Sequence, residues 1–228
     1  MKTAFQALLA ALLAVAPAAA EAANWVTTPQ GGGSLYNVPV KSLVELRFER
    51  VVRQGYDLSC GAAALATLLT YFYRDERDER QIIERVFEFG DKEKISRDGF
   101  SMLELKHYAE DVGYVAQGFR IDDVNMLEKI KIPYITLVSV RGYNHFVVVK
   151  TVSEGKVYIA DPAFGNRTMG IESFAGVWNH IVLGVMSAVN AGDSSFGVHG
   201  TVKARMSDVR TLIDYGLRPL QPSAGSFR

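Results

Sequence analysis

The sequence contains a single cysteine, Cys60, in 228 residues. One thiol excludes an internal disulfide, and it also excludes the cysteine clusters of structural zinc sites. The four histidines are not paired at helical or hairpin spacing, so the sequence predicts no metal site. No glycine-rich phosphate loop precedes a helical pattern, and we therefore expect neither a bound nucleotide nor another cofactor.

Net charge is absent as well, because 25 lysine and arginine residues balance 25 aspartate and glutamate residues. Long-range attraction to nucleic acids or to anionic membranes is therefore not expected. Hydrophobic residues make up 48% of the chain and charged residues 22%, which is ordinary for a globular protein. The sequence does not indicate an oligomeric state.

The most prominent apolar run lies at the N-terminus. A lysine stands near the start, residues 4–20 are rich in alanine and leucine, and residues 18–20 offer a small-x-small cleavage site. This pattern predicts a secretory signal peptide over residues 1–23, with the mature chain beginning between Ala19 and Asn24. A membrane anchor is the alternative, but the run is too short and too alanine-rich to span a bilayer well. We therefore expect a periplasmic or secreted bacterial protein without an integral membrane domain after signal removal.

The rest of the chain, roughly 205 residues, is long enough for one domain with a substantial core. We assign residues 24–190 to that domain and residues 191–228 to a C-terminal extension rich in glycine, serine and polar residues. Residues 207–215 predict one amphipathic helix in the extension, and residues 216–228 predict a loose end. Gly31-Gly32-Gly33 belongs to a polar stretch that we interpret as a flexible leader into the domain.

The region around Cys60 carries the first chemical signal. Leu65, Leu68, Leu69 and Phe72 follow at helical spacing, which predicts a helix with one buried face and Cys60 at its N-terminus. The partial positive charge at that end favours the thiolate over the thiol. Cys60 is therefore a candidate nucleophile, and a buried, inert cysteine is the alternative.

The loop before this helix supplies a second candidate. Gly55, Asp57 and Ser59 favour a turn and can cap the start of the helix. Gln54 lies six residues before Cys60. From there its side-chain amide can donate a hydrogen bond to an oxygen close to the sulfur.

A nucleophilic cysteine needs a base, and the base needs an orienting group. His145 opens a run of β-prone residues, and the next such run, residues 157–160, leads directly into Asp161. A tight turn over residues 153–156 joins the two runs, which predicts an antiparallel hairpin. Pairing brings the start of the first strand beside the end of the second, so His145 and Asp161 become neighbours.

Two other histidines are alternative partners for the thiol. His180 is possible, but no acidic residue follows it in a matching turn. His107 falls on a predicted helix beside Lys106 and Glu110, where a surface position is expected. We therefore favour His145.

The motifs resemble those of a known family. Gln54, Cys60-Gly61-Ala62-Ala63, Asn144-His145-Phe146 and Asp161-Pro162-Ala163 are similar in order and spacing to the motifs of C39 peptidases. These are papain-like cysteine proteases, best known as leader-cleaving domains of bacteriocin export transporters. The resemblance covers residues 51–165.

The resemblance implies a role for each of four residues. Cys60 corresponds to the nucleophile, His145 to the general base, Asp161 to the residue that orients the histidine, and Gln54 to the oxyanion donor. The transporter members continue into a membrane domain and an ATPase, and this chain shows neither pattern. It resembles a stand-alone, exported member, so cleavage after paired glycines is not implied.

The order of predicted elements favours an α+β fold with two layers, in which N-terminal helices pack on an antiparallel sheet. This order agrees with the papain-like arrangement that the resemblance implies. The expected elements are extended structure over 35–52, helices over 60–72, 81–89, 101–112, 122–131 and 171–177, a charged loop over 91–99, and strands over 114–121, 133–140, 145–152, 157–160 and 178–189.

Three functions follow from these residues. The first is a cysteine peptidase that hydrolyses a secreted or cell-surface polypeptide through Cys60, His145, Asp161 and Gln54. The second is a transglutaminase-like acyltransferase, which uses the same chemistry with an amine as acceptor. The third is a peptide-binding module of the same fold without catalysis. The sequence specifies no side-chain pocket, so the substrate and its cleavage site are not predicted.

Overall fold

The computed structural model describes residues 25–26, 36–37, 41–140, 142–189, 192–197 and 218–219. The predicted signal peptide, the three glycines at 31–33 and the predicted helix at 207–215 lie outside the described residues. Strand β1 (Trp25–Val26) pairs antiparallel with β2 (Tyr36–Asn37) in a unit of its own, residues 1–42. The site and both hydrophobic cores belong to the second unit, residues 43–228.

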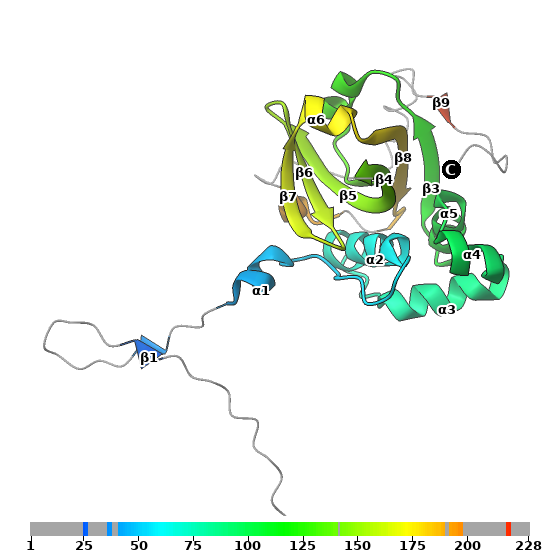
Figure 1. Ribbon diagram of the computed structural model, residues 1–228, viewed down its shortest axis with the longest axis horizontal. Coiled ribbons are helices and arrows are strands. Elements are labelled where there is room, and N and C mark those ends of the chain that lie inside the picture. Colours follow the sequence, from blue (N-terminus) through cyan, green and yellow to red (C-terminus); the bar gives the residue numbers. More distant parts are fainter. Residues whose placement is uncertain are drawn as a thin grey trace, which may run out of the picture. The chain divides into compact units, whose positions relative to one another are not determined.

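Helices dominate the first half of this unit, as Figure 1 shows. They are α1 (Leu43–Arg47), α2 (Cys60–Thr67), η1 (Leu68–Phe72), α3 (Glu79–Phe89), α4 (Lys92–Asp98) and α5 (Met102–Asp111). The π-helix η1 continues α2 directly. Capping boxes begin both α3 and α5, because Asp78 and Ser101 accept helix N–H groups while Gln81 and Glu104 reach back.

The second half forms a seven-stranded antiparallel sheet in the order β7-β6-β5-β4-β8-β3-β9. Its strands are β3 (Val115–Arg120), β4 (Tyr134–Val140), β5 (Tyr143–Ser153), β6 (Lys156–Asp161), β7 (Gly165–Gly170), β8 (Trp178–Met186) and β9 (Arg218–Pro219). Three short helices accompany them: η2 (Val124–Lys129), α6 (Ile171–Ala175) and η3 (Ser194–Phe196).

Two hydrophobic clusters cover the two faces of the sheet. The larger cluster contains the buried side of α2, η1, α3 and α5, with α2 packed on β5 and α5 on β3. The smaller cluster joins η2 and α6 to the opposite face. In Figure 1, α2 to α5 accordingly lie on one side of the sheet and α6 on the other. The predicted α+β architecture, with helices on an antiparallel sheet, is confirmed.

The predicted hairpin is also confirmed. Strands β5 and β6 pair antiparallel with Val148 opposite Ala160 and Val149 opposite Ile159, and the register shifts between Val149 and Thr151. The turn that joins them contains Gly155 at φ 67°. The start of β5 and the end of β6 therefore lie at the same end of the hairpin.

Four local predictions were wrong or incomplete. Residues 43–47 form α1 rather than extended chain, although none of their side chains is buried. Residues 92–98 form α4 rather than a loop, because Asp91 accepts the Lys94 N–H and the single apolar residue Ile95 is buried. Strands β7 and β9 were not predicted. Strand β7 is mostly polar, and β9 has only two residues, so neither shows an alternating pattern.

The chain beyond the predicted boundary at residue 190 takes part in the fold. Arg50 donates hydrogen bonds to Asp193 Oδ2 at 2.9 Å and to the Ser195 carbonyl at 2.7 Å. Phe196 is buried in the larger cluster, and β9 pairs with β3. The described part of the extension is therefore attached to the domain at both places.

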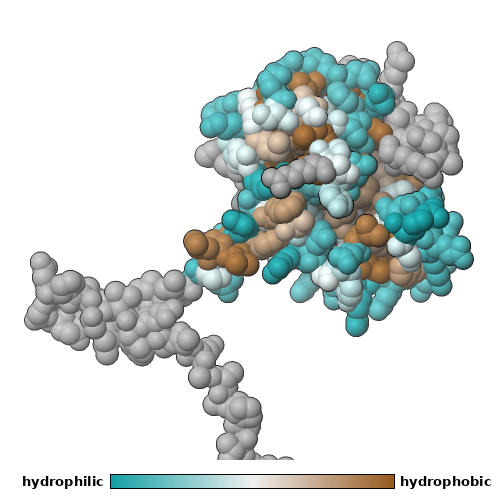
Figure 2. All heavy atoms as spheres, viewed as in Figure 1, coloured by the Kyte–Doolittle hydropathy of each residue, from teal (hydrophilic) through white to brown (hydrophobic). Residues whose placement is uncertain are grey.

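Figure 2 shows an apolar region of the surface at α1, where Leu43, Val44 and Leu46 are exposed. Helices long and apolar enough to cross a membrane do not occur among the described residues.

Candidate active site

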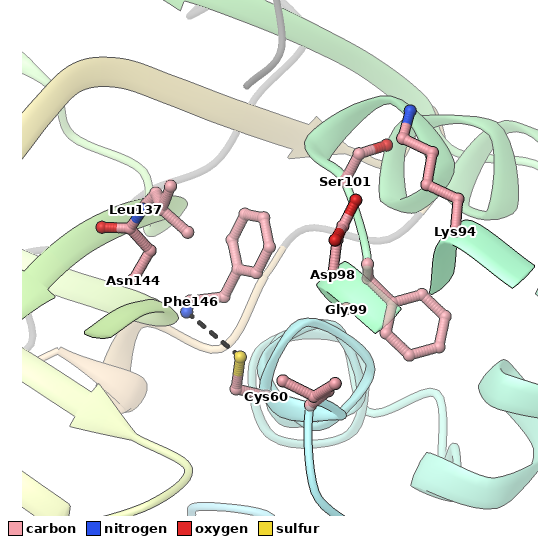
Figure 3. A pocket seen from close by; sticks show the side chains of 10 residues that line it. Cys60, Lys94, Asp98, Gly99, Ser101, Leu137, Asn144 and Phe146 are labelled. Atoms are coloured by element: carbon pink, nitrogen blue, oxygen red, sulfur yellow. Dashed lines mark hydrogen bonds between the residues drawn. The ribbon is translucent and has the colours of Figure 1, made fainter. Parts of the chain in front are cut away.

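Cys60 is the first residue of α2, and its side chain is half-buried. The Phe146 N–H, on β5, donates a hydrogen bond to the sulfur at 3.4 Å, as the dashed line in Figure 3 shows. The backbone turns sharply before the helix, with Leu58 in the left-handed region at φ 64°. The helix can bury itself against β5 because the five residues after Cys60 are small or apolar, and Ala62 to Ala66 are fully buried.

Burial raises the pKa of the Cys60 thiol. The N–H groups of Phe146 and Gly61 oppose this effect by stabilising the thiolate, and the negative charge of Asp161 adds to the increase. The sequence predicted the opposite direction from the position at a helix N-terminus. That stabilisation is present, but the loss of water around the sulfur outweighs it.

His145 lies near the start of β5, one residue before the backbone that contacts the sulfur. Its Nε2 atom is 3.1 Å from Asp161 Oδ2. A hydrogen bond at Nε2 leaves Nδ1 as the ring nitrogen available for a second partner. The structure thus pairs His145 with Asp161, and the residue after His145 contacts the sulfur of Cys60, the third member of the predicted group.

Asp161 is fully buried at the end of β6, and both of its carboxylate oxygens are occupied. Oδ1 accepts the N–H groups of Ala163 and Phe164 at 2.9 and 3.1 Å. Oδ2 faces His145 and also lies 3.5 Å from the Arg167 Nε atom. The turn after β6 and the guanidinium on β7 therefore hold the carboxylate in place.

Sequence reasoning missed two of these neighbours. The Phe164 ring meets the His145 ring edge-on, with centroids 6.0 Å apart. The guanidinium of Arg167 lies over the Phe164 ring, 5.5 Å from its centroid. Arg167 could not be found because it lies on the strand that was not predicted.

Gln54 lies beside the same turn. Its backbone N–H donates to the Pro162 carbonyl at 3.0 Å, next to Asp161. Its Nε2 atom is 3.5 Å from the Tyr56 carbonyl, and its buried Oε1 has no hydrogen-bond partner among the described residues. The loop from Gln54 to Cys60 thus connects the acidic end of β6 with the nucleophile helix.

His180 and His107 lie elsewhere. The His180 Nδ1 atom is 3.1 Å from the Ile121 carbonyl, and its ring packs 4.8 Å from Trp178 on the side of the smaller cluster. His107 is exposed on α5, where its ring lies 6.3 Å from that of Phe89. His199 lies outside the described residues.

A cavity of about 290 Å³ opens beside the sulfur. Figure 3 shows it between Leu137 on β4 and Asn144 on β5 on one side and Asp98 and Ser101, which flank the loop from α4 to α5, on the other. It is lined by Leu58, Cys60, Lys94, Asp98, Gly99, Phe100, Ser101, Leu137, Asn144 and Phe146. A second cavity of about 490 Å³ lies next to it along α3 and shares Leu58 and Phe100. Within the described part of the chain, no group of His, Cys, Asp and Glu side chains could hold a metal ion.

A cysteine on a helix, with a histidine and an acid on an antiparallel sheet, defines the papain-like class of cysteine peptidases. Residues 49–190 match the model of the peptidase C39 family. The chain belongs to this family and is a cysteine peptidase.

The most informative relatives are bacterial. The "probable functional amyloid protease FapD" of Pseudomonas aeruginosa is 44% identical over 156 residues, which is 68% of each chain. The protein of the same name from Pseudomonas fluorescens is 41% identical over 155 residues, again 68% of each chain. Among solved structures, a double-glycine-motif protease from an AMS/PCAT transporter, in complex with its leader peptide, is 32% identical with a TM-score of 0.50. That match covers 59% of this chain and 89% of the protease.

Proposed function

We propose that the chain cleaves peptide bonds with Cys60 as nucleophile, His145 as general base, Asp161 as orienting residue and Gln54 as oxyanion donor. The observation that carries this proposal is the 3.1 Å contact between His145 Nε2 and Asp161 Oδ2, one residue away from the N–H that touches the Cys60 sulfur. The resemblance to C39 peptidases also supports it, because the same four residue types follow one another in the same order along the chain.

Burial raises the pKa of Cys60 and so favours the thiol before substrate binds. Nδ1 of His145 takes the proton of the Cys60 thiol as the sulfur attacks the carbonyl carbon. The negative charge on the carbonyl oxygen is met by the Cys60 N–H and the Gln54 amide. Losing one such donor typically costs about 100-fold or more in rate.

The acyl-enzyme then forms and breaks down. His145 gives its proton to the leaving amine, so the C–N bond breaks and a thioester to Cys60 remains. Water enters, His145 removes its proton, and attack on the thioester releases the carboxylic acid and restores the thiol. Asp161 stabilises the imidazolium in both halves of the cycle.

We further propose that the substrate is an extended segment of a polypeptide that is exported through the cell envelope. The two adjoining cavities provide room for residues on one side of the scissile bond. The FapD relatives are named for a functional amyloid, and the transporter protease binds a leader peptide. A component of a functional amyloid system is therefore the first substrate to test, with the predicted signal at residues 1–23 directing the enzyme to the periplasm or beyond.

The test is digestion of a proteome-derived peptide library, with cleavage sites identified by mass spectrometry. Wild-type protein should cleave, whereas Cys60→Ala and His145→Ala should show no cleavage above background. His107→Ala serves as the matched histidine control and should cleave at the wild-type rate. Equal cleavage by wild type and Cys60→Ala would rule out the assigned nucleophile.

A further inference from the structure

Glu79 is a buried acid outside the group of four residues discussed above. It is the first residue of α3, and only 6% of its surface is exposed. Its Oε2 accepts the Gly55 N–H at 2.9 Å, and its Oε1 lies 2.5 Å from the Ser59 hydroxyl oxygen. Among the described residues, no lysine or arginine forms an ion pair with this carboxyl group. A buried carboxyl group is costly unless hydrogen bonds satisfy it, so these contacts hold the loop firmly.

The two contacts lie at the two ends of one short loop. Gln54 precedes the loop and Cys60 follows it, so Glu79 fixes the segment between the proposed oxyanion donor and the nucleophile. Leu58, in the middle at φ 64°, lines both cavities. The position of the carboxyl group therefore determines the path of the loop past the sulfur and between the cavities.

The contact between Ser59 and Glu79 has a second consequence, at the start of α2. It occupies the N-cap position of α2, yet its hydroxyl makes no hydrogen bond to the helix. The hydroxyl instead lies 2.6 Å from the Tyr56 carbonyl and 2.5 Å from Glu79. A serine at this position usually caps the first N–H groups of a helix, and that was the expectation from the sequence. With the hydroxyl turned away, the Ser59 side chain blocks none of the N–H groups beside Cys60.

From these contacts we infer that Glu79 is a positioning residue for the oxyanion site. It acts through Gly55 and Ser59. These contacts hold the loop so that Gln54 and the uncapped start of α2 face the carbonyl oxygen of the substrate. This inference rests on the proposed peptidase mechanism. Misplacement of such donors by about 1 Å costs on the order of 100-fold in rate, so the contribution is measurable.

The hydrogen bonds of Glu79 suggest two variants, one that keeps these contacts and one that removes them. A serine hydroxyl has one proton and cannot donate to Tyr56 and to position 79 at once. Glutamine at 79 keeps both contacts, because its oxygen accepts the Gly55 N–H and its amino group donates to Ser59. Leucine has a similar size but makes neither contact. Glu79→Gln should therefore retain the function that Glu79→Leu loses.

The experiment measures kcat and KM on a peptide that the wild type cleaves, together with amide hydrogen exchange, at neutral pH. Glu79→Leu should lower kcat about 10- to 100-fold with KM within about threefold. Exchange of the amides in residues 54–60 should accelerate, while exchange in β5 should stay unchanged. Glu79→Gln should lose less than about fivefold in kcat, and Glu88→Leu, an exposed site on α3, is the matched control.

Wild-type kcat in a folded Glu79→Leu protein would overturn the inference, and so would equal losses in Glu79→Leu and Glu79→Gln. If Glu79→Leu does not fold, Ser59→Ala decides: lower kcat with faster loop exchange supports the inference, and wild-type kcat contradicts it. Should the wild type cleave no peptide, the proposed function fails. The exchange comparison between the two Glu79 variants then still tests whether this carboxyl group holds the loop.

Discussion

Asp161 is held by four neighbours that share its two oxygens. Asparagine at this position would keep one oxygen for the Ala163 and Phe164 N–H groups. Its amino group would then face His145 and Arg167, replacing an acceptor by a donor. We expect Asp161→Asn to fold and to lower kcat by up to about 10⁴-fold, because a donor facing Nε2 favours the tautomer whose proton sits on Nδ1, and the imidazolium also loses its counter-charge.

The measurement is kcat on a cleavable peptide, with circular dichroism to confirm folding. The loss should be smaller than for Cys60→Ala or His145→Ala, since the nucleophile and the base are both still present. Unchanged kcat in a folded Asp161→Asn protein would show that Asp161 does not assist His145.

The thiol of Cys60 provides a pH prediction. Burial raises its pKa above the ordinary value of 9.0, so the folded state favours the neutral thiol. The rate of alkylation by iodoacetamide should therefore keep rising with pH to beyond pH 9 in the folded protein. In urea-unfolded protein the same curve should level off at lower pH. A plateau below neutrality in the folded protein would instead indicate a preformed thiolate–imidazolium pair.

Helix α2 shows how an element positions the nucleophile. Because it is packed on β5 with almost no exposed surface, its first turns consist of glycine and alanine. A Cβ atom at Gly61 would lie 3.1 Å from both the Phe100 Cβ and Phe146 Cδ2 atoms. These two phenylalanines also line the cavity beside the sulfur. The small side chains thus allow the sulfur, the Phe146 N–H and the cavity wall to meet.

We expect Gly61→Ala to lower the free energy of unfolding by roughly 1–3 kcal/mol, because the helix must move away from its neighbours. The kcat should fall as well, since the sulfur moves with the helix. Gly176→Ala is the matched control, because its added Cβ would have no contact closer than 3.7 Å. Thermal or urea unfolding measures both variants, and a Gly61→Ala protein as stable as the control would contradict this account.

At the scale of the whole molecule, the domain is closed by contacts between residues 50–72 and residues 193–196. Arg50 holds Asp193, the Asp193 N–H donates to the Phe72 carbonyl, and Phe196 enters the core. The family match ends at residue 190, so Asp193 and Phe196 lie beyond it. A protein shortened to the matched residues would lose a buried aromatic side chain.

The stability that the contacts of Asp193 contribute should depend on pH. Hydrogen bonds from Ser195, and then the charge of Arg50, lower the pKa of Asp193 from 3.8 to about 2. A lowered pKa stabilises the fold fully above pH 4, and this contribution disappears as the pH falls toward 2. Asp193→Asn should therefore lower Tm by about 2–4 °C at pH 7 and by much less near pH 2.5. Calorimetry at both values checks this, and an equal difference at the two pH values would contradict it.

Local patterns in the sequence were sufficient for most of the elements and for the pairing of His145 with Asp161. The apolar spacing after Cys60, the capping box at Ser101 and the hairpin from His145 to Asp161 each depend on residues close together in the chain. Such features involve few competing alternatives, because helix period and turn chemistry operate over a few residues. The order of the candidate residues could therefore be interpreted before their positions were known.

Other features depend on contacts between distant segments. Glu79 meets Ser59 across 20 positions, and Arg50 meets Asp193 across 143, and neither pairing has a local signature. Strand β7 forms because it pairs with the edge of β6. Its own residues are mostly polar and do not predict a strand. The pKa of Cys60 shows the same limit: the sequence indicates a helix N-terminus, which favours the thiolate, but burial depends on how β5 packs. Charge and desolvation oppose each other there, and only the three-dimensional arrangement determines which is larger.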